Sequence, residues 1–238
     1  GIRDSVASRG LGDVYKRQLI LLIFSCSSHK DYDILIKNGI IADGSGNPTY
    51  IGSVGINADT IAAVGKLEAT GRLEIDATGL VVAPGFINML SWATESLIQN
   101  GRSESDIMQG VTLEVFGEGW SMGPLNKNLK EELQLPTAQG DIIYDIDWNT
   151  LDEYLQSLVR RGISPNVASF IGATTVRINH IGYENRAPTD EELNSMKQMV
   201  KEAMEDGALG VGSSLIYAPA FYSSTEELIE LSLSLIHI

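Results

Sequence analysis

Few residues of this chain could do chemistry, and the two clearest candidates follow predicted strands. Glu118 stands between two glycines directly after the apolar run Val111–Phe116, and His180 follows the run Asn166–Ile171. Carboxylate and imidazole groups are both common ligands of zinc. Glu118 is therefore a candidate metal ligand, with an ordinary loop carboxylate as its alternative. His180 is expected in the loop after that strand and is a candidate substrate-binding residue, with a surface histidine as its alternative.

Composition excludes several classes of function. The chain has 238 residues, a formal net charge of -14 and 43% hydrophobic residues. Such a charge argues against binding to nucleic acid, because few cations are left to neutralise phosphates. The hydrophobic content indicates a folded core. A single cysteine excludes an internal disulfide framework and any metal site built from several cysteines.

The elements that would position these residues alternate between strands and capped helices. Thr150 and Thr189 each precede a glutamate by three residues and open apolar periodic runs, which is the pattern of a helical capping box. The further apolar run Ala208–Tyr217 is predicted as a strand. Strands alternating with helices predict a parallel sheet, and the four units in residues 81–232 amount to half of a (β/α)8 TIM-type barrel.

Two segments around these units have other patterns. Residues 32–80 alternate apolar and polar positions with turn signals, and Asn38-Gly39 predicts a tight hairpin. This segment is expected to be a β layer in front of the barrel. Gly117–Asn149 is long and has little periodicity, so we expect a lid over the strand ends. The predicted fold class is thus α/β.

Several sequence stretches resemble one known group of proteins. The order DILIKNG, DGSG, IAAVG and IDATGLVVAPGF, followed by RAPTDEEL, MVKEAMEDGALG and APAFYSSTEEL, is similar to the amidohydrolase superfamily, most closely to its N-acyl-D-amino-acid deacylase branch. The resemblance covers residues 32–232. It implies that residues 32–80 form part of a small β-sandwich and residues 81–232 the first half of the barrel.

The resemblance also implies where ligands should be, and this chain departs from it. The family continues the first barrel strand with Asp-x-His-x-His, whereas this chain has Asn88, Leu90 and Trp92 at those places. We expect Leu90 and Trp92 to be apolar plugs of the barrel mouth, with Trp92 as a wall of the substrate pocket as the alternative. The family's cysteine ligand after the second strand is also absent, and Glu118 is the carboxylate nearest that place. Tyr217 is expected to contact substrate by the same resemblance, against a capping role.

The implied function is hydrolysis of a linear carbon-nitrogen amide bond in a small molecule, such as an N-acyl-D-amino acid. With the His-x-His pair gone, we expect a degenerate metal site holding a divalent metal, at most a single zinc. The later histidines and the catalytic aspartate would lie beyond Ser232, so the present segment alone should be inactive. A non-catalytic ligand-binding lipoprotein on a degenerate barrel and a hydrolase of cyclic amides remain alternatives.

The two ends of the chain are expected to have a different origin from the rest. Ser8–Gln18 and Leu233–Ile238 resemble the translation of one sequencing adapter in its two orientations. We therefore expect residues 1–18 and 233–238 to be adapter-derived. Residues 19–31 resemble the end of a lipoprotein signal and a linker, with Cys26 as the lipidation site. The protein is accordingly expected to be exported, with a lipid anchor on the periplasmic side as its only membrane contact.

Overall fold

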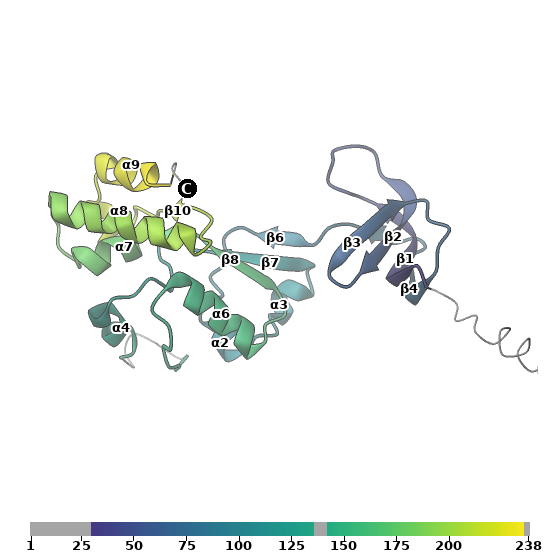
Figure 1. Ribbon diagram of the computed structural model, residues 1–238, viewed down its shortest axis with the longest axis horizontal. Coiled ribbons are helices and arrows are strands. Elements are labelled where there is room, and N and C mark those ends of the chain that lie inside the picture. Colours follow the sequence, from purple (N-terminus) through teal and green to yellow (C-terminus); the bar gives the residue numbers. More distant parts are fainter. Residues whose placement is uncertain (1–29, 136–141, 236–238) are drawn as a thin grey trace, which may run out of the picture. The chain divides into compact units, whose positions relative to one another are not determined.

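The computed structural model describes residues 30–135 and 142–235 (Figure 1). Cys26 and most of the predicted signal and adapter-derived segments lie outside the described residues. The described chain divides between Pro84 and Gly85 into two compact units. Within that part of the chain, no helix is both long enough and apolar enough to cross a membrane.

The first unit is one mixed sheet. Its order is β3-β2-β1-β4, and the short β5 continues beside β1 where β4 ends. The pairs β1–β2 and β2–β3 are antiparallel, while β4 and β5 run parallel to β1. The strands are β1 (Tyr32–Ile41), β2 (Tyr50–Asn57), β3 (Thr60–Gly65), β4 (Gly71–Asp76) and β5 (Val81–Val82).

The hairpin predicted at Asn38-Gly39 is wrong, because β1 runs through this pair without turning. Ile36 faces Val54 and Gly39 faces Gly52, so β1 uses one residue more than β2 over this stretch. Asn38 takes a positive φ of 62°. Asparagine tolerates this left-handed conformation, which serves a β-bulge as well as a turn. The Asn-Gly signal therefore marked a bulge.

One face of this sheet is apolar and largely uncovered in the described chain. Cross-strand partners share a face, and Ile34 pairs with Leu73 while Ile36 pairs with Ile75. Leu73 and Ile75 are nevertheless 54% and 43% exposed. Leu35, whose side chain points to the opposite face, is fully buried. The apolar alternation in the sequence thus correctly marked a sheet face that the described residues do not cover.

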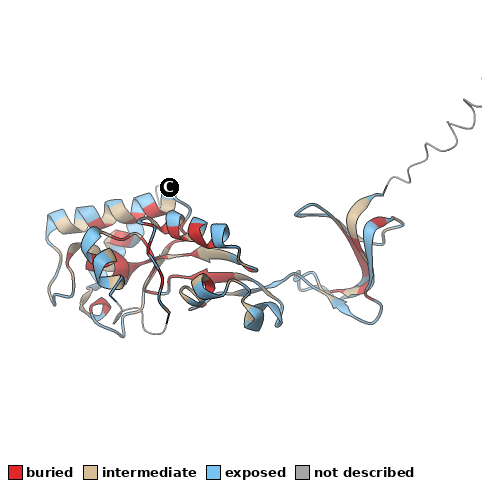
Figure 2. Ribbon diagram, turned by 90° about the horizontal axis from the view of Figure 1, so that it is seen from below, coloured by how far each residue is buried: buried red, intermediate tan, exposed pale blue. Residues whose placement is uncertain are grey.

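The second unit is a mixed α/β arrangement in which every paired strand is parallel. Its buried residues follow the strands and the inner sides of the helices (Figure 2). Its elements are β6 (Phe86–Asn88), α2 (Ser96–Gln99), α3 (Glu104–Ile107), β7 (Val111–Phe116), α4 (Lys127–Leu133), α6 (Leu151–Arg161), β8 (Asn166–Ser169), β9 (Ile171–Gly172), α7 (Ala173–His180), α8 (Asp190–Glu205), β10 (Val211–Gly212), η1 (Ala220–Tyr222) and α9 (Thr225–Leu233).

The strands pair in the order in which they occur along the chain. β6, β7 and β8 form one sheet and β9 pairs with β10. Only Phe170 separates β8 from β9, and its amide donates to the carbonyl of Phe116. The predicted strand Asn166–Ile171 is therefore present as β8 and β9. The strand predicted over Ala208–Tyr217 is largely wrong, because its ladder consists of Val211 and Gly212 alone.

The helix starts predicted from the sequence agree with the structure where side chains cap the helix. The hydroxyls of Thr150 and Thr189 accept from the amides of Glu153 and Glu192, and both glutamates complete the capping boxes of α6 and α8. No such signal precedes α7, which begins after Gly172 without a side-chain cap. The segment carrying His180 was expected to be a loop, and this expectation is wrong.

The long segment before α6 is part of the core rather than a lid. Trp148 is fully buried, stacks on Tyr144 with ring centroids 6.1 Å apart, and donates from Nε1 to the Met122 carbonyl over 2.6 Å. Its ring also contacts that of Tyr154 in α6, at 5.2 Å. The lid expectation is therefore wrong for the stretches around Met122, Tyr144 and Trp148. The segment has little sequence periodicity because its packing comes from aromatic residues scattered along it, and the sequence interpretation therefore missed this part of the core.

Candidate functional site

A cavity of about 220 Å3 lies beyond the carboxyl ends of the parallel strands. Trp92 reaches it after β6, Trp120 after β7, and Tyr217 after β10. Carboxyl ends of parallel strands share one edge of a sheet, and this edge carries the active sites of α/β barrels. The remaining lining residues are Gly119, Thr174, Ile178, Tyr183, Ser214, Ala218 and Pro219.

Glycines let the backbone segments behind this cavity approach closely. Gly117 has a φ of 92°, and a Cβ there would lie 2.1 Å from the Phe170 carbonyl oxygen. A Cβ at Gly119 would lie 2.8 Å from the amide nitrogen and Cβ of Ser214. Both positions exclude a side chain. The Gly-Glu-Gly sequence therefore lets the end of β7 approach Phe170, between β8 and β9, and Ser214, after β10.

The described residues do not form a metal site. Glu118 is exposed and its side chain makes no hydrogen bond or ion pair to described residues, although it stands at the strand end where the sequence put it. No three His, Cys, Asp or Glu residues converge within the described ranges. Leu90 and Trp92 carry no ligand atom and are 52% and 65% exposed. The expectation that these two plug the barrel mouth stays a prediction, because the described residues do not close a barrel.

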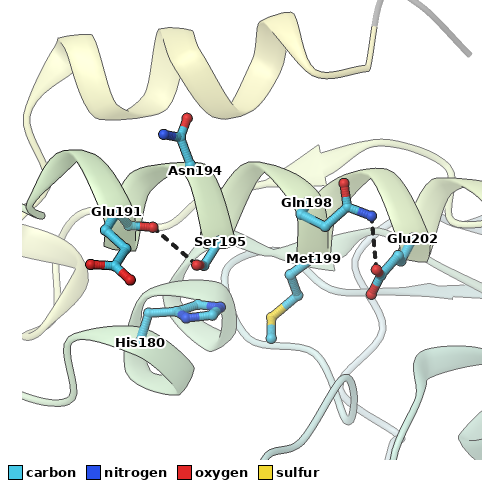
Figure 3. Close-up of a pocket in the computed structure, with 7 residues that line it drawn as sticks. All are labelled: His180, Glu191, Asn194, Ser195, Gln198, Met199 and Glu202. Atoms are coloured by element: carbon cyan, nitrogen blue, oxygen red, sulfur yellow. Dashed lines mark hydrogen bonds between the residues drawn. The ribbon is translucent and has the colours of Figure 1, made fainter.

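The structure brings together two of the three predicted substrate-binding residues. Trp92 and Tyr217 line the same cavity, about 125 positions apart in the chain. His180 is the last residue of α7 and instead lines a separate open hollow of about 620 Å3 along α8, with Glu191, Ser195 and Met199 (Figure 3). We place the candidate site at the smaller cavity because it is aromatic and stands at the strand ends.

Burial favours the neutral form of the His180 imidazole. Its Nε2 is buried and has no hydrogen-bond partner among the described residues. Burial lowers the pKa of His180 because the charged form loses solvation, and the carboxylate of Glu192 opposes this shift only in part. A neutral, half-buried imidazole at a helix end agrees with a packing role as well as with a binding role.

Trp120 and Tyr183 line the cavity and were missed by the sequence interpretation. The Tyr183 hydroxyl donates to Oε1 of Glu132 over 2.7 Å. Burial, reinforced by this hydrogen bond, raises the pKa of Tyr183 to about 12, so the phenol stays protonated. Tyr183 lies in a connection without periodicity, where no sequence signal marks it. Trp120 follows the Gly-Glu-Gly sequence, and that proximity was the available signal.

Comparison with known proteins identifies relatives of one kind. No family model matches the chain. A D-aminoacylase of Alcaligenes xylosoxydans xylosoxydans is 34% identical over 209 residues, which cover 87% of this chain and 42% of that protein. The chain therefore spans less than half of the length of this relative.

Two solved structures share its fold. A D-aminoacylase whose binuclear metal center shows one-metal activation and second-metal attenuation is 30% identical, with a TM-score of 0.73 over 87% of this chain and 43% of that one. The N-acyl-D-glutamate deacylase of Bordetella bronchiseptica, complexed with zinc and a phosphonate mimic of the tetrahedral intermediate, is 28% identical, with a TM-score of 0.73 over 85% and 42%. The sequence resemblance to amidohydrolases is confirmed.

Proposed function

Because this chain belongs to the D-aminoacylase branch of the amidohydrolase superfamily, we propose that the complete protein hydrolyses the amide bond of an N-acyl-D-amino acid. The observation that carries the proposal is the aromatic cavity at the carboxyl ends of the strands, where Trp92, Trp120 and Tyr217 converge. The relatives that are 28–34% identical to this chain over the aligned residues are a D-aminoacylase and an N-acyl-D-glutamate deacylase.

In this proposal the second unit is the first half of a TIM-type barrel, of about four βα units. The sequential parallel pairing of β6, β7 and β8, and then of β9 with β10, supports it. Right-handed βα units add strands in this way. The first unit would be part of the small β-sandwich, and its exposed apolar face, with Leu73 and Ile75, is what a partial sandwich leaves open.

The residues of the cavity are proposed to bind the apolar part of the substrate. Sites for whole small molecules usually have volumes of roughly 300–1,000 Å3, so about 220 Å3 fits one substituent. The rings of Trp92 and Tyr217 would contact that substituent from two sides. Their burial against it would orient the amide bond at the strand ends. No step of bond cleavage is assigned to a described residue.

We propose that the metal of the complete protein is a single zinc. Zinc accompanies the related glutamate deacylase, but the described residues of this chain do not fit such a site, since Leu90 and Trp92 cannot coordinate and Glu118 stands alone. The ligands would then come mainly from residues outside the described part. Elemental analysis of the purified complete protein should find about one zinc per chain, and none in residues 27–232 expressed alone.

A direct assay tests the hydrolase. The complete protein is incubated with N-acetyl-D-leucine and, separately, with N-acetyl-L-leucine, and the free amino acid is measured. We expect release from the D enantiomer, and a KM raised about tenfold by Tyr217→Ala through loss of ring contact. Absence of release from every N-acyl-D-amino acid tried would contradict the proposal. The matched control Tyr222→Ala changes a tyrosine that does not line the cavity.

A second candidate is a non-catalytic binding protein on the same scaffold. Apolar side chains where the relatives' family has metal ligands, Leu90 and Trp92, favour it. Both candidates predict saturable binding of N-acetyl-D-leucine, which the tryptophans of the cavity would report as a fluorescence change. Binding without release of D-leucine by the zinc-loaded protein would support the binder over the hydrolase.

We also propose export with a lipid anchor at Cys26. The apolar run before this cysteine and the polar residues after it support the proposal. Expression of the complete gene with a labelled fatty acid should give a labelled, membrane-associated product. Cys26→Ser should abolish both the label and the membrane association. An unlabelled wild-type protein would contradict the lipid anchor and would leave the hydrolase proposal unaffected.

A further inference from the structure

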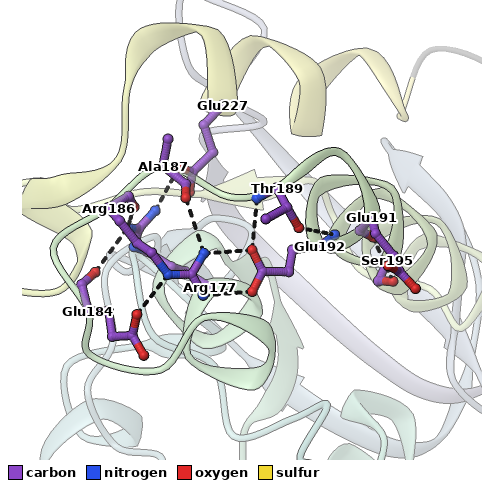
Figure 4. A network of polar contacts seen from close by, with 9 residues as sticks. All are labelled: Arg177, Glu184, Arg186, Ala187, Thr189, Glu191, Glu192, Ser195 and Glu227. Atoms are coloured by element: carbon purple, nitrogen blue, oxygen red, sulfur yellow. Dashed lines mark hydrogen bonds and ion pairs between the residues drawn. The ribbon is translucent and has the colours of Figure 1, made fainter.

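A buried arginine joins three segments of the second unit (Figure 4). Arg177 in α7 donates from Nη1 to Oε2 of Glu227 at the start of α9, over 2.6 Å. Its Nη2 donates to the backbone carbonyls of Glu184, at 3.3 Å, and Arg186, at 2.5 Å. The side chains of Arg177 and Glu227 are 0% and 2% exposed. One guanidinium thus holds α7, the connection between α7 and α8, and α9.

The walls of the aromatic cavity come from the same three segments. Ile178 is the neighbour of Arg177 in α7, and Tyr183 directly precedes Glu184 in the connection. Tyr217 and Pro219 belong to the segment that leads into α9. That segment is also held by Ser223, whose hydroxyl donates to Oε1 of Glu227.

We propose that Arg177 is a positioning residue of the cavity, which sets the distance between the Ile178 wall, the Tyr183 wall and the Tyr217 wall. The ligand of the cavity rests on the proposed function, while the positioning itself does not. A planar guanidinium suits this role because its donors point in fixed directions to a carboxylate and two carbonyls at once. A lysine presents a point charge and cannot reproduce that fork.

The energetics of the pair also favour positioning over stabilisation. Burying two charges costs about as much as their attraction returns, so an apolar pair of similar volume is often neutral or stabilising. Nε of Arg177 is buried and finds no hydrogen-bond partner within the described residues, which adds to the cost. What an apolar pair cannot supply is the link from α7 to the Glu184 and Arg186 carbonyls.

Other side chains anchor the connection between α7 and α8 near its two ends, whereas Arg177 holds its middle. Arg186 binds both carboxylate oxygens of Glu192 at 2.7 Å, at the start of α8. Tyr183 reaches Glu132 near the end of α4. Between these points, Arg177 is the side chain of α7 that fixes the backbone at Glu184 and Arg186. Its loss should therefore free the cavity wall without releasing α8.

Two variants of the complete protein separate positioning from stability. Arg177→Met with Glu227→Leu replaces the pair by apolar side chains and leaves no unpaired charge. Arg177→Lys keeps a cation beside Glu227 and loses the fork, so it tests the same idea if the double variant does not fold. Lys197→Met is the matched control, because Lys197 bridges α8 to Glu230 of α9 over 2.6 Å and touches no cavity wall.

The first readout is amide hydrogen exchange over residues 181–189, which needs no substrate. We expect exchange there to become about tenfold faster in both Arg177 variants, with exchange in α8 unchanged. The second readout is the kinetics of N-acetyl-D-leucine hydrolysis. KM should rise about tenfold with kcat within about threefold, since misplaced walls weaken binding more than chemistry. Lys197→Met should change neither readout.

The outcomes separate the two proposals. Unchanged exchange over residues 181–189 in a folded Arg177 variant overturns the positioning role, and so does a fall in kcat with KM unchanged, which is the signature of a smaller folded fraction. A wild-type protein that neither binds nor hydrolyses any N-acyl-D-amino acid tried overturns the proposed function. In that case the exchange measurement still decides the role of Arg177.

Discussion

The hydroxyl oxygen of Ser91 lies 2.6 Å from Oε2 of Glu114, a carboxylate with no exposed surface in the middle of β7. The hydroxyl of Ser103, which precedes α3, donates to Oε1 over 2.6 Å as well. Two hydroxyls thus satisfy both oxygens of a buried charge. The arrangement ties β7 to the segment after β6 that carries Trp92 and to the start of α3.

Replacing Glu114 should therefore destabilise the chain. Glu114→Ala leaves the hydroxyls of Ser91 and Ser103 without their acceptor and opens a small cavity, at an expected cost of about 1–3 kcal/mol in the free energy of unfolding. Urea unfolding followed by circular dichroism measures it. Glu104→Ala, an exposed glutamate of α3, serves as the control and should cost no more than about 0.5 kcal/mol. Similar losses of stability in the two variants would show that the buried contacts of Glu114 contribute no more than those of an exposed glutamate.

The same substitution should cost very different amounts of stability at two tryptophans of the second unit. Trp148→Ala removes a fully buried ring and leaves the Met122 carbonyl unpaired, so it should cost about 3–5 kcal/mol of stability. Trp92→Ala removes a ring that is 65% exposed and should cost less than about 1 kcal/mol. Thermal unfolding of both variants compares them. A Trp148 variant as stable as the wild type would contradict the core role of this segment and would support the lid interpretation.

Acid should weaken the contact between the α7–α8 connection and α8. The Arg186 guanidinium, and then the Thr189 amide, lower the pKa of Glu192 from its ordinary 4.5 to about 2. A carboxylate with a depressed folded pKa stabilises the fold above its unfolded pKa, and this contribution is lost as the pH falls from about 4.5 to about 2. Glu192→Gln keeps the capping box and should flatten the dependence of the melting temperature on pH in that window. Arg186→Met should flatten it too. Slopes equal to that of the wild type would contradict the assignment.

The lining of the aromatic cavity predicts which substrates are accepted. None of its described lining residues is Asp, Glu, Lys or Arg, so a carboxylate buried there would have no partner. The kcat/KM for N-acetyl-D-leucine should exceed that for N-acetyl-D-glutamate by about tenfold or more. Competition between the two substrates in one assay measures this ratio directly. A preference for the glutamate derivative would show that a cation from elsewhere in the complete protein completes the cavity.

Hydrophobic dye binding tests the open sheet face of the first unit. Leu73 and Ile75 lie beside Ile34 and Ile36 on one apolar face that the described residues leave uncovered. Residues 27–232 expressed alone should bind the dye or aggregate, because exposed apolar patches of this kind associate. Leu73→Thr with Ile75→Thr should reduce the dye signal. A monodisperse, cooperatively melting wild-type segment that binds no dye would contradict this expectation.

The sequence by itself determined the local elements whose signals are complete within a few residues. The capping boxes at Thr150 and Thr189 set the starts of α6 and α8, because hydroxyl, amide and carboxylate are all neighbours in the chain. The strand Val111–Phe116 was predicted with the bounds of β7, since Gly110 and Gly117 bound a short stretch rich in β-branched and aromatic residues. The APGFI and RAPTDEEL stretches carried the family assignment. Trp92 and Tyr217 line one cavity at the strand ends, and their contact with substrate stays a prediction.

Only the tertiary structure decided features that depend on partners distant in the chain. Asn38 could make a turn or a bulge, and pairing with β2 chose the bulge. α7 contains β-branched residues and no cap, yet it is helical because its environment buries most of it. Trp148 and Arg177 carry no local pattern, since what defines them is burial against residues up to 50 positions away. Local hydrogen bonds are determined by residues that are neighbours in the sequence, whereas packing and buried charge pairs form only once the chain has folded.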